Sequence, residues 1–152
     1  MNSAEDLKAL YRDTVLEHSR NPRHCGRLES ATHSAIGHNP LCGDKVTVHL
    51  KIDGDRIEDI AFEGTGCAIS LASASIMTET EIHHTVDEAK QETDKILQQF
   101  SSTQDNAPAI EGEMAALGSV RQYPSRIKCA TLAWKTLEAA LSDDAQQVTT
   151  EK

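Results

Sequence analysis

Basic residues are scarce in this sequence of 152 residues, where 15 lysines and arginines stand against 24 aspartates and glutamates. The formal net charge of −9 argues against a general nucleic-acid binder, because neutralising phosphates requires clustered Lys and Arg side chains. Long hydrophobic runs are also missing. Without an apolar stretch of about 18 residues, no membrane-spanning helix is predicted.

Features of a secretion signal are absent as well. The first residues, MNSAEDLKAL, lack a basic segment and a long apolar segment, so we expect a cytoplasmic protein. Thiols stay reduced in that compartment, and the four cysteines therefore indicate metal binding, catalysis or burial before disulfides. No two cysteines form a Cys-x-x-Cys pair, which disfavours zinc ribbons and thioredoxin-type redox sites.

The length and the 38% hydrophobic content suit one globular domain with its own core. We predict this domain over residues 1–142, followed by a flexible polar tail over residues 143–152. No internal repeat and no second domain are visible in the sequence.

The order of helix and strand patterns predicts an α+β fold. A helix precedes a small three-stranded antiparallel sheet, and further helices pack on one face of that sheet. Capping-box pairs mark two helix starts, and small residues after Cys67 allow a helix to pack closely. The expected elements are a helix from Ser3 to about Asn21, strands over 32–38, 45–52 and 56–63, and helices from Cys67, from Thr85 to about Phe100, over 111–117 and from Ser125 to Leu141.

Three cysteines occupy comparable places in this predicted fold. Cys42 lies in a tight turn before a strand, in HNPLCGDKVT; Cys67 follows Gly-Thr-Gly at a helix start; Cys129 lies near the start of the last helix. A helix N-terminus carries partial positive charge and free N–H groups, so it favours the thiolate. The thiolate is both the nucleophilic and the metal-binding form of cysteine.

Spacing alone leaves three interpretations open: buried or unrelated cysteines, a metal site, and a nucleophilic cysteine. In a metal site, three thiolates and one oxygen fit tetrahedral zinc. Asp44, on the same turn as Cys42, is the natural fourth ligand in that case. Its alternative role is that of a turn carboxylate which accepts backbone N–H groups.

Three motifs, HNPLCGDKVTV, FEGTGCAIS and YPSRIKCATLAW, resemble the IscU/SufU family of iron–sulfur cluster assembly proteins, which are NifU N-terminal-like, and specifically its SufU branch. The resemblance covers residues from about 7 to about 141. It implies the same α+β fold. It also implies that Cys42, Asp44, Cys67 and Cys129 surround a metal site for Zn²⁺, or alternatively for iron or a transient iron–sulfur cluster.

The sequence departs from the IscU branch of this family at two places. IscU-type proteins carry His immediately before the third cysteine, where this sequence has Lys128. Their chaperone-docking segment is replaced here by YPSRIK, residues 123–128. We therefore expect neither a histidine ligand nor docking to the dedicated Hsp70-type chaperone. Residues 101–124 and Arg126, in contrast, match the SufU branch.

The resemblance implies a sulfur carrier that is sulfurtransferase-like rather than a self-sufficient enzyme. A pyridoxal-phosphate (PLP)-dependent cysteine desulfurase of the SufS type would make a persulfide, Cys42 would accept its outer sulfur, and downstream Suf scaffold proteins would receive it. Arg126 would assist by pairing with Asp44 or the thiolate, unless it is a solvated helix-end charge. Two alternatives remain: a scaffold on which an iron–sulfur cluster is assembled on the same ligands, and a structural zinc domain.

Several other residues carry weaker expectations. Cys25 fits no ligand motif and is expected to be a spare thiol. His83 and His84 lie between two predicted helices and are expected to be solvated. His49 is expected on the polar face of its strand, and Trp134 in the core.

Overall fold

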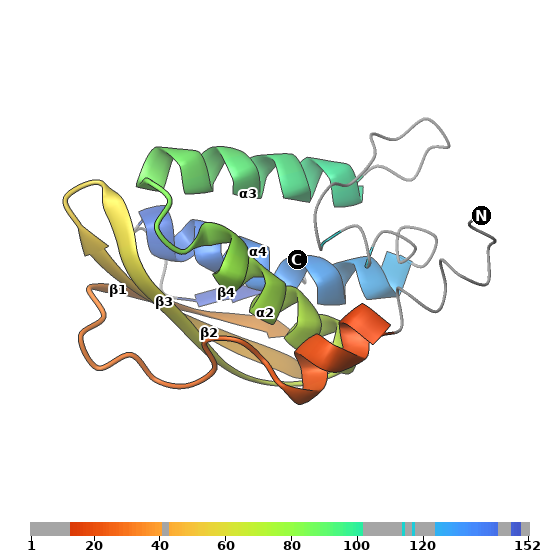
Figure 1. Ribbon diagram of the computed structural model, residues 1–152. Helices are drawn as coiled ribbons and strands as arrows, with labels where there is room; N and C mark the ends of the chain where they lie inside the picture. The colour runs from red at the N-terminus through yellow and green to blue at the C-terminus, as the bar shows by residue number, and fades with distance from the viewer. Residues whose placement is uncertain are drawn as a thin grey trace, which may run out of the picture.

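The computed structural model describes residues 13–40, 43–101, 114, 117, 124–142 and 147–149. After a helical segment over residues 13–20, its elements are β1 (His33–Asn39), β2 (Asp44–Asp53), β3 (Arg56–Thr65), α2 (Ala68–Glu81), α3 (Val86–Ser101), α4 (Pro124–Ser142) and β4 (Gln147–Thr149). Helices α2 and α4 lie on one face of the sheet, and α3 packs against α4 farther from the sheet (Figure 1). The predicted α+β class with helices on one sheet face is confirmed.

The sheet has the strand order β3-β2-β1-β4. Strands β1, β2 and β3 are antiparallel neighbours, as predicted. Strand β4 is an addition, because Gln147–Thr149 pairs in parallel with β1, opposite Ile36 and its two successors. The predicted polar tail over 143–152 therefore contains a short strand at residues 147–149. A three-residue strand is too short to show a hydrophobic period, and it is fixed by pairing with β1.

Alternation along β2 builds the core, as the sequence predicts. Val46, Val48 and Leu50 have no exposed surface, whereas Lys45 on the opposite face is exposed. His49 lies on that opposite face, as expected, and is 9% exposed. Its Nδ1 lies 3.2 Å from Ser34 Oγ, and its Nε2 lies 3.8 Å from a carboxylate oxygen of Glu63.

Small side chains bring α2 close to the sheet and to α4. Ala72, Ser73 and Ala74 are fully buried, and the Ser73 hydroxyl donates a hydrogen bond to the carbonyl of Ala130 on α4. Trp134 of α4 is fully buried too, as predicted. Close approach of these two helices positions their N-terminal halves relative to each other, which matters because each half carries a candidate site cysteine.

The predicted capping box of α3 is present. The backbone N–H of Thr85 donates to Glu88 Oε1 at 2.9 Å, and the N–H of Glu88 donates to Thr85 Oγ1 at 3.1 Å. The hydrogen bond from the Thr85 backbone is the larger cause, and the one with the Thr85 side chain the next, of those that lower the pKa of Glu88 below its ordinary value.

Helix α4 begins at Pro124, which is one residue before the predicted cap, Ser125. Proline suits the first helical position because it has no N–H to leave unpaired.

Two predicted helix boundaries lie outside the part of the chain that the structure describes. The first helix ends after residue 20, as predicted, but its expected start at Ser3 lies outside the described residues. Of the predicted helix over 111–117, Met114 and Leu117 are described, and both are buried.

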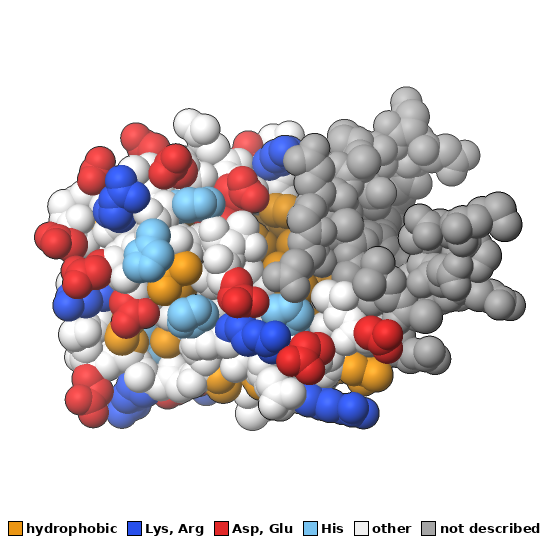
Figure 2. Space-filling view, in the orientation of Figure 1, with side chains coloured by type: hydrophobic (Ala, Val, Ile, Leu, Met, Phe, Trp, Pro, Cys, Tyr) orange, Lys and Arg blue, Asp and Glu red, His pale blue; other side chains and the backbone are white. Residues whose placement is uncertain are grey.

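Charged side chains of both signs are interspersed on the face seen in Figure 2, and its described residues form no broad basic patch. Among the helices that the structure describes, none is long and apolar enough to cross a membrane.

Candidate metal site

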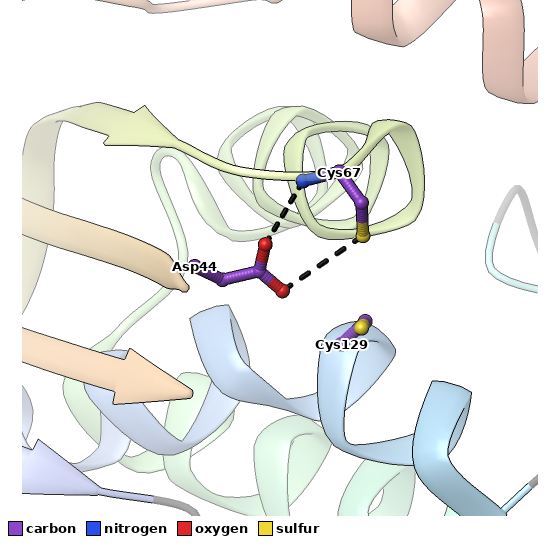
Figure 3. A group of neighbouring side chains, drawn as sticks. All are labelled: Asp44, Cys67 and Cys129. Carbon is purple, nitrogen blue, oxygen red and sulfur yellow. Dashed lines mark hydrogen bonds between the residues drawn. The ribbon is translucent and has the colours of Figure 1, made fainter. Parts of the chain in front are cut away.

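Asp44 is the first residue of β2, and its side chain is almost fully buried. Its Oδ1 accepts the backbone N–H of Cys67 at 2.9 Å, and its Oδ2 lies 3.8 Å from Cys67 Sγ (Figure 3). One carboxylate oxygen is thus used by the backbone, while the other faces the sulfur. Asp44 therefore accepts a backbone N–H, though at the start of α2 rather than in its own turn, and this role is compatible with the predicted ligand role because each uses a different oxygen.

The side chains of Asp44, Cys67 and Cys129 converge. One ligand atom from each lies within 4.8 Å of the other two, and this is the only group of that kind among the residues that the structure describes. A tetrahedral zinc ion with sulfur ligands at about 2.3 Å requires ligand atoms roughly 3.5–3.8 Å apart. The three groups therefore fit a metal ion after small side-chain adjustments.

Gly66 allows β2 and α2 to meet at this point. Its φ of +149° lies in a region that L side chains rarely adopt. A Cβ atom on this residue would overlap Oδ1 of Asp44. The Gly-Thr-Gly sequence before Cys67 thus has a specific steric purpose, which is to let the Asp44 carboxylate reach the backbone at the start of α2.

The two cysteines of the cluster differ in their surroundings. Cys67 is the N-cap residue of α2 and is partly exposed, as a helix-start position predicts. Cys129 is fully buried and is the sixth residue of α4, beyond the free N–H groups of the first turn. The helix-start position predicted for both cysteines is therefore present for Cys67 and not for Cys129.

Asn39 is a site residue that the sequence analysis missed. It is the last residue of β1, it has no exposed surface, and its Nδ2 lies 3.6 Å from Cys129 Sγ and 3.5 Å from Asp44 Oδ2. The available signal was its place at the end of a predicted strand, directly before the Cys42 turn. Nothing in the sequence, however, indicated that Cys129 would be its neighbour.

Cys42 lies outside the described residues. The two ends of its loop are placed, because Asn39 and Asp44 are paired across β1 and β2. The N–H of Gly43 donates to the carbonyl of Asn39 at 2.9 Å, and Gly43 has a φ of +72°. Arg126 lies on the exposed side of α4, three residues before Cys129. The roles of Cys42 and Arg126 stay predictions.

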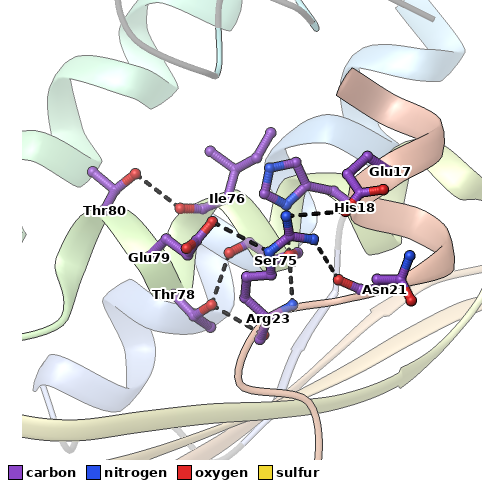
Figure 4. A network of polar contacts seen from close by, with 9 residues as sticks. All are labelled: Glu17, His18, Asn21, Arg23, Ser75, Ile76, Thr78, Glu79 and Thr80. Carbon is purple, nitrogen blue, oxygen red and sulfur yellow. Dashed lines mark hydrogen bonds and ion pairs between the residues drawn. The ribbon is translucent and has the colours of Figure 1, made fainter. Parts of the chain in front are cut away.

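Helix α2 is held farther along by a polar network (Figure 4). Ser75 Oγ lies 2.7 Å from Nδ1 of the buried His18 and accepts the backbone N–H of Arg23 at 2.8 Å. The Arg23 guanidinium contacts Glu17 at 3.2 Å and Glu79 at 3.7 Å. This network fixes the segment before the sheet onto the helix that begins at Cys67.

The remaining candidates lie away from the three-residue cluster. Cys25 is exposed and is not part of the cluster. His83 is exposed, as expected, but Nδ1 of His84 lies 3.1 Å from Oε1 of the fully buried Glu81. Burial raises the pKa of Glu81 to about 7, although the contact with His84 lowers it. The sequence analysis expected a solvated His84, but its ring contacts the buried Glu81 carboxylate.

Residues 10–150 match the family model described as the NifU-like N terminal domain. The chain belongs to the IscU/SufU family. It is 40% identical over 145 residues to the iron–sulfur cluster assembly scaffold protein IscU of Streptococcus pyogenes, covering 94% of this chain and 91% of that one. It is 38% identical over 145 residues to the zinc-dependent sulfurtransferase SufU of Bacillus subtilis, covering 95% and 97%.

A solved structure agrees with the family assignment. The crystal structure of an iron–sulfur cluster assembly scaffold protein for the SUF system, the SufU of Fervidobacterium islandicum AW-1, superimposes with a TM-score of 0.76 at 36% identity, covering 88% of this chain and 97% of that one. Relatives named for IscU and for SufU are about equally similar to this chain, so overall identity does not choose between the two branches.

Proposed function

We propose that this protein is an iron–sulfur cluster assembly protein that acts as a zinc-dependent sulfur carrier in the cytoplasm. It receives persulfide sulfur from a PLP-dependent cysteine desulfurase and passes it to downstream Suf scaffold proteins. The observation that carries the proposal is the convergence of Asp44, Cys67 and Cys129 within 4.8 Å, beside the loop that contains Cys42. The zinc-dependent sulfurtransferase SufU of Bacillus subtilis supports it.

In this proposal Cys42, Asp44, Cys67 and Cys129 hold Zn²⁺. When bound, zinc supplies a positive centre that keeps the coordinating thiols deprotonated. Asp44 offers Oδ2, since Oδ1 already accepts the N–H of Cys67. Cys129 is fully buried and Cys67 is tied to a helix start, so both suit a stable ligand role.

Sulfur acceptance is assigned to Cys42. Its thiolate attacks the outer sulfur of the donor persulfide, forming a new S–S bond at Cys42 as the donor's S–S bond breaks. The donor cysteine leaves as a thiolate, and the transferred outer sulfur keeps its proton on Cys42, so no external oxidant or reductant is needed. Arg126 is proposed to assist through its positive charge. The carrier thereby holds sulfur at the oxidation level at which it was received.

A scaffold function is the second candidate. It is favoured by the Streptococcus pyogenes relative, which is named a scaffold protein. Thiolate ligands also suit iron–sulfur clusters. Lys128, where IscU-type proteins have histidine, favours the carrier instead. Metal analysis of the purified protein separates the two candidates, since a zinc carrier is colourless and a cluster scaffold is brown and contains iron and sulfide.

The decisive experiment incubates the protein with a cysteine desulfurase and cysteine, then locates persulfide by mass spectrometry. We expect the persulfide on Cys42, and we expect Cys42→Ala to abolish both sulfur acceptance and stimulation of desulfurase turnover. Cys25→Ala is the matched control and should retain both. Persulfide mainly on Cys67 or Cys129, or full stimulation by Cys42→Ala, would contradict the carrier proposal and favour the scaffold.

A further inference from the structure

The Asn39 side chain reaches two candidate metal ligands at once. Its Nδ2 lies 3.5 Å from Asp44 Oδ2 and 3.6 Å from Cys129 Sγ, and all three side chains are buried. Both distances are at the long end for hydrogen bonds. A side-chain amide carries two N–H groups, so one nitrogen can donate to the carboxylate and to the sulfur.

Charge explains why such a donor is needed there. Three thiolates and one carboxylate around a divalent cation leave an excess of negative charge, and Asp44 and Cys129 lie where water does not reach. Buried charge is costly unless hydrogen bonds compensate for it. Groups that hydrogen-bond metal ligands typically orient those ligands and raise metal affinity.

The backbone of Asn39 has a separate structural task. Its carbonyl accepts the N–H of Gly43 at 2.9 Å, which closes the turn between β1 and β2, and Asn39 pairs with Asp44 at the end of the ladder. Neither interaction involves the side chain. A substitution at residue 39 can therefore remove the amide donors without removing the hydrogen bond that closes the turn.

We propose that Asn39 is a positioning residue of the metal site, whose side-chain amide bridges Asp44 and Cys129 and offsets the excess negative charge of the ligand set. This inference rests on the metal site of the proposed function. It connects β1 to the site, so that β1, β2, the start of α2 and α4 all contribute to it.

The test compares the wild-type chain with Asn39→Leu, which keeps a similar volume without donors, and Asn39→Ala. Zinc affinity is measured by competition with a chromogenic chelator, and absorption spectra are recorded after loading with cobalt(II). We expect zinc affinity to fall by roughly 10–100-fold, the usual effect of losing a group that hydrogen-bonds a ligand. The sulfur-to-cobalt charge-transfer band should move to longer wavelength, because a thiolate that has lost its donor gives up an electron more easily.

Ser75→Ala is the matched control. It removes a buried hydroxyl that bonds His18 and Arg23, about eight residues or 12 Å along α2 from Cys67. It should lower stability and leave both zinc affinity and the cobalt band unchanged. A general loss of stability is thus distinguished from a change at the ligands.

The outcomes separate this inference from the proposed function. Folded Asn39 variants with wild-type affinity and an unmoved cobalt band overturn the inference while the metal site stands. A wild-type chain that binds no metal overturns the proposed function, and the inference with it. If neither variant folds, NMR of the wild-type chain loaded with an NMR-active cadmium isotope decides. Coupling from the Asn39 side-chain amide to cadmium through Cys129 sulfur supports the inference, and its absence overturns it.

Discussion

Oε1 of Glu81, whose side chain has no exposed surface, lies 3.1 Å from Nδ1 of His84. Its second oxygen, Oε2, is buried without a hydrogen-bond partner. Burial is the largest cause that raises the pKa of Glu81, to about 7 from an ordinary 4.5; Glu92 and Glu88 add to the rise, and His84 opposes it. The end of α2 thus holds a carboxyl group that folding favours in its neutral form.

This carboxyl group should make stability depend on pH. Because its pKa is higher in the folded chain, the folded state binds more protons between pH 4.5 and about 7. Its stabilising contribution is complete below pH 4.5 and is lost as the pH rises through about 7. The loss is on the order of 3 kcal/mol at most. Chemical denaturation across this range should show a smaller decline for Glu81→Gln. Glu79→Gln, at an exposed position on the same helix, should behave like the wild type.

Gly66→Ala should disturb the metal site directly. The new methyl group would overlap Oδ1 of Asp44 and would force the carboxylate or the start of α2 to move. Gly26→Ala is the control, because Gly26 has a similar φ of +133° and nothing near its Cβ position. We expect Gly26→Ala to cost about 1 kcal/mol of unfolding free energy, and Gly66→Ala about 1–3 kcal/mol more. Only Gly66→Ala should lower zinc affinity, measured by chelator competition. Equal affinities of the two variants would show that the new methyl group is accommodated without displacing the Asp44 carboxylate from the site.

Removing a single ligand should deplete bound metal. Cys67→Ala and Cys129→Ala each leave the cluster one thiolate short, so the purified proteins should contain much less zinc than the wild type by elemental analysis. Cys25→Ala, which alters an exposed thiol outside the cluster, should retain the full amount. Near-complete occupancy in either of the first two variants would remove that cysteine from the ligand set.

Asp44→Asn isolates the charge of the carboxylate. The amide oxygen can still accept the N–H of Cys67, so the contact between β2 and the start of α2 is expected to persist, whereas the negative ligand is lost. Zinc affinity should fall by at least about tenfold, and persulfide should still map to Cys42 by mass spectrometry. Unaltered affinity would indicate that the Asp44 carboxylate only accepts the N–H of Cys67 and does not bind the ion.

Metal removal should lower the melting temperature. Asp44, Cys67 and Cys129 come from β2, the start of α2 and α4, so an ion bound by all three stabilises only the assembled fold. Calorimetry of the chelated protein should show earlier melting, and zinc addition should restore the original curve. An identical melting curve after verified zinc removal would contradict a contribution of metal to folding.

Local patterns made most of the fold predictable. The alternation of Val46, Val48 and Leu50 gave β2, and the pair Thr85 and Glu88 gave the start of α3, because each signal lies within a few residues. The contact of Asn39 with Cys129 joins residues 90 positions apart, and no local pattern encodes it. The burial of Glu81 could not be predicted for the same reason. A glutamate is ordinarily expected at the surface, and here residues distant in the sequence cover its side chain.

The spread of the cluster along the chain has a consequence for newly made protein. Asp44 and Cys67 are 23 positions apart, but Cys129 follows Cys67 by roughly 60 residues, or about 3–12 s of synthesis at a ribosomal rate of about 5–20 residues per second. During that interval the Cys67 thiol has left the ribosome before the helix that carries Cys129 exists. A nascent chain therefore passes through a period in which this thiol lacks its partner sulfur, and stable loading of the proposed metal site would begin only after α4 has been made.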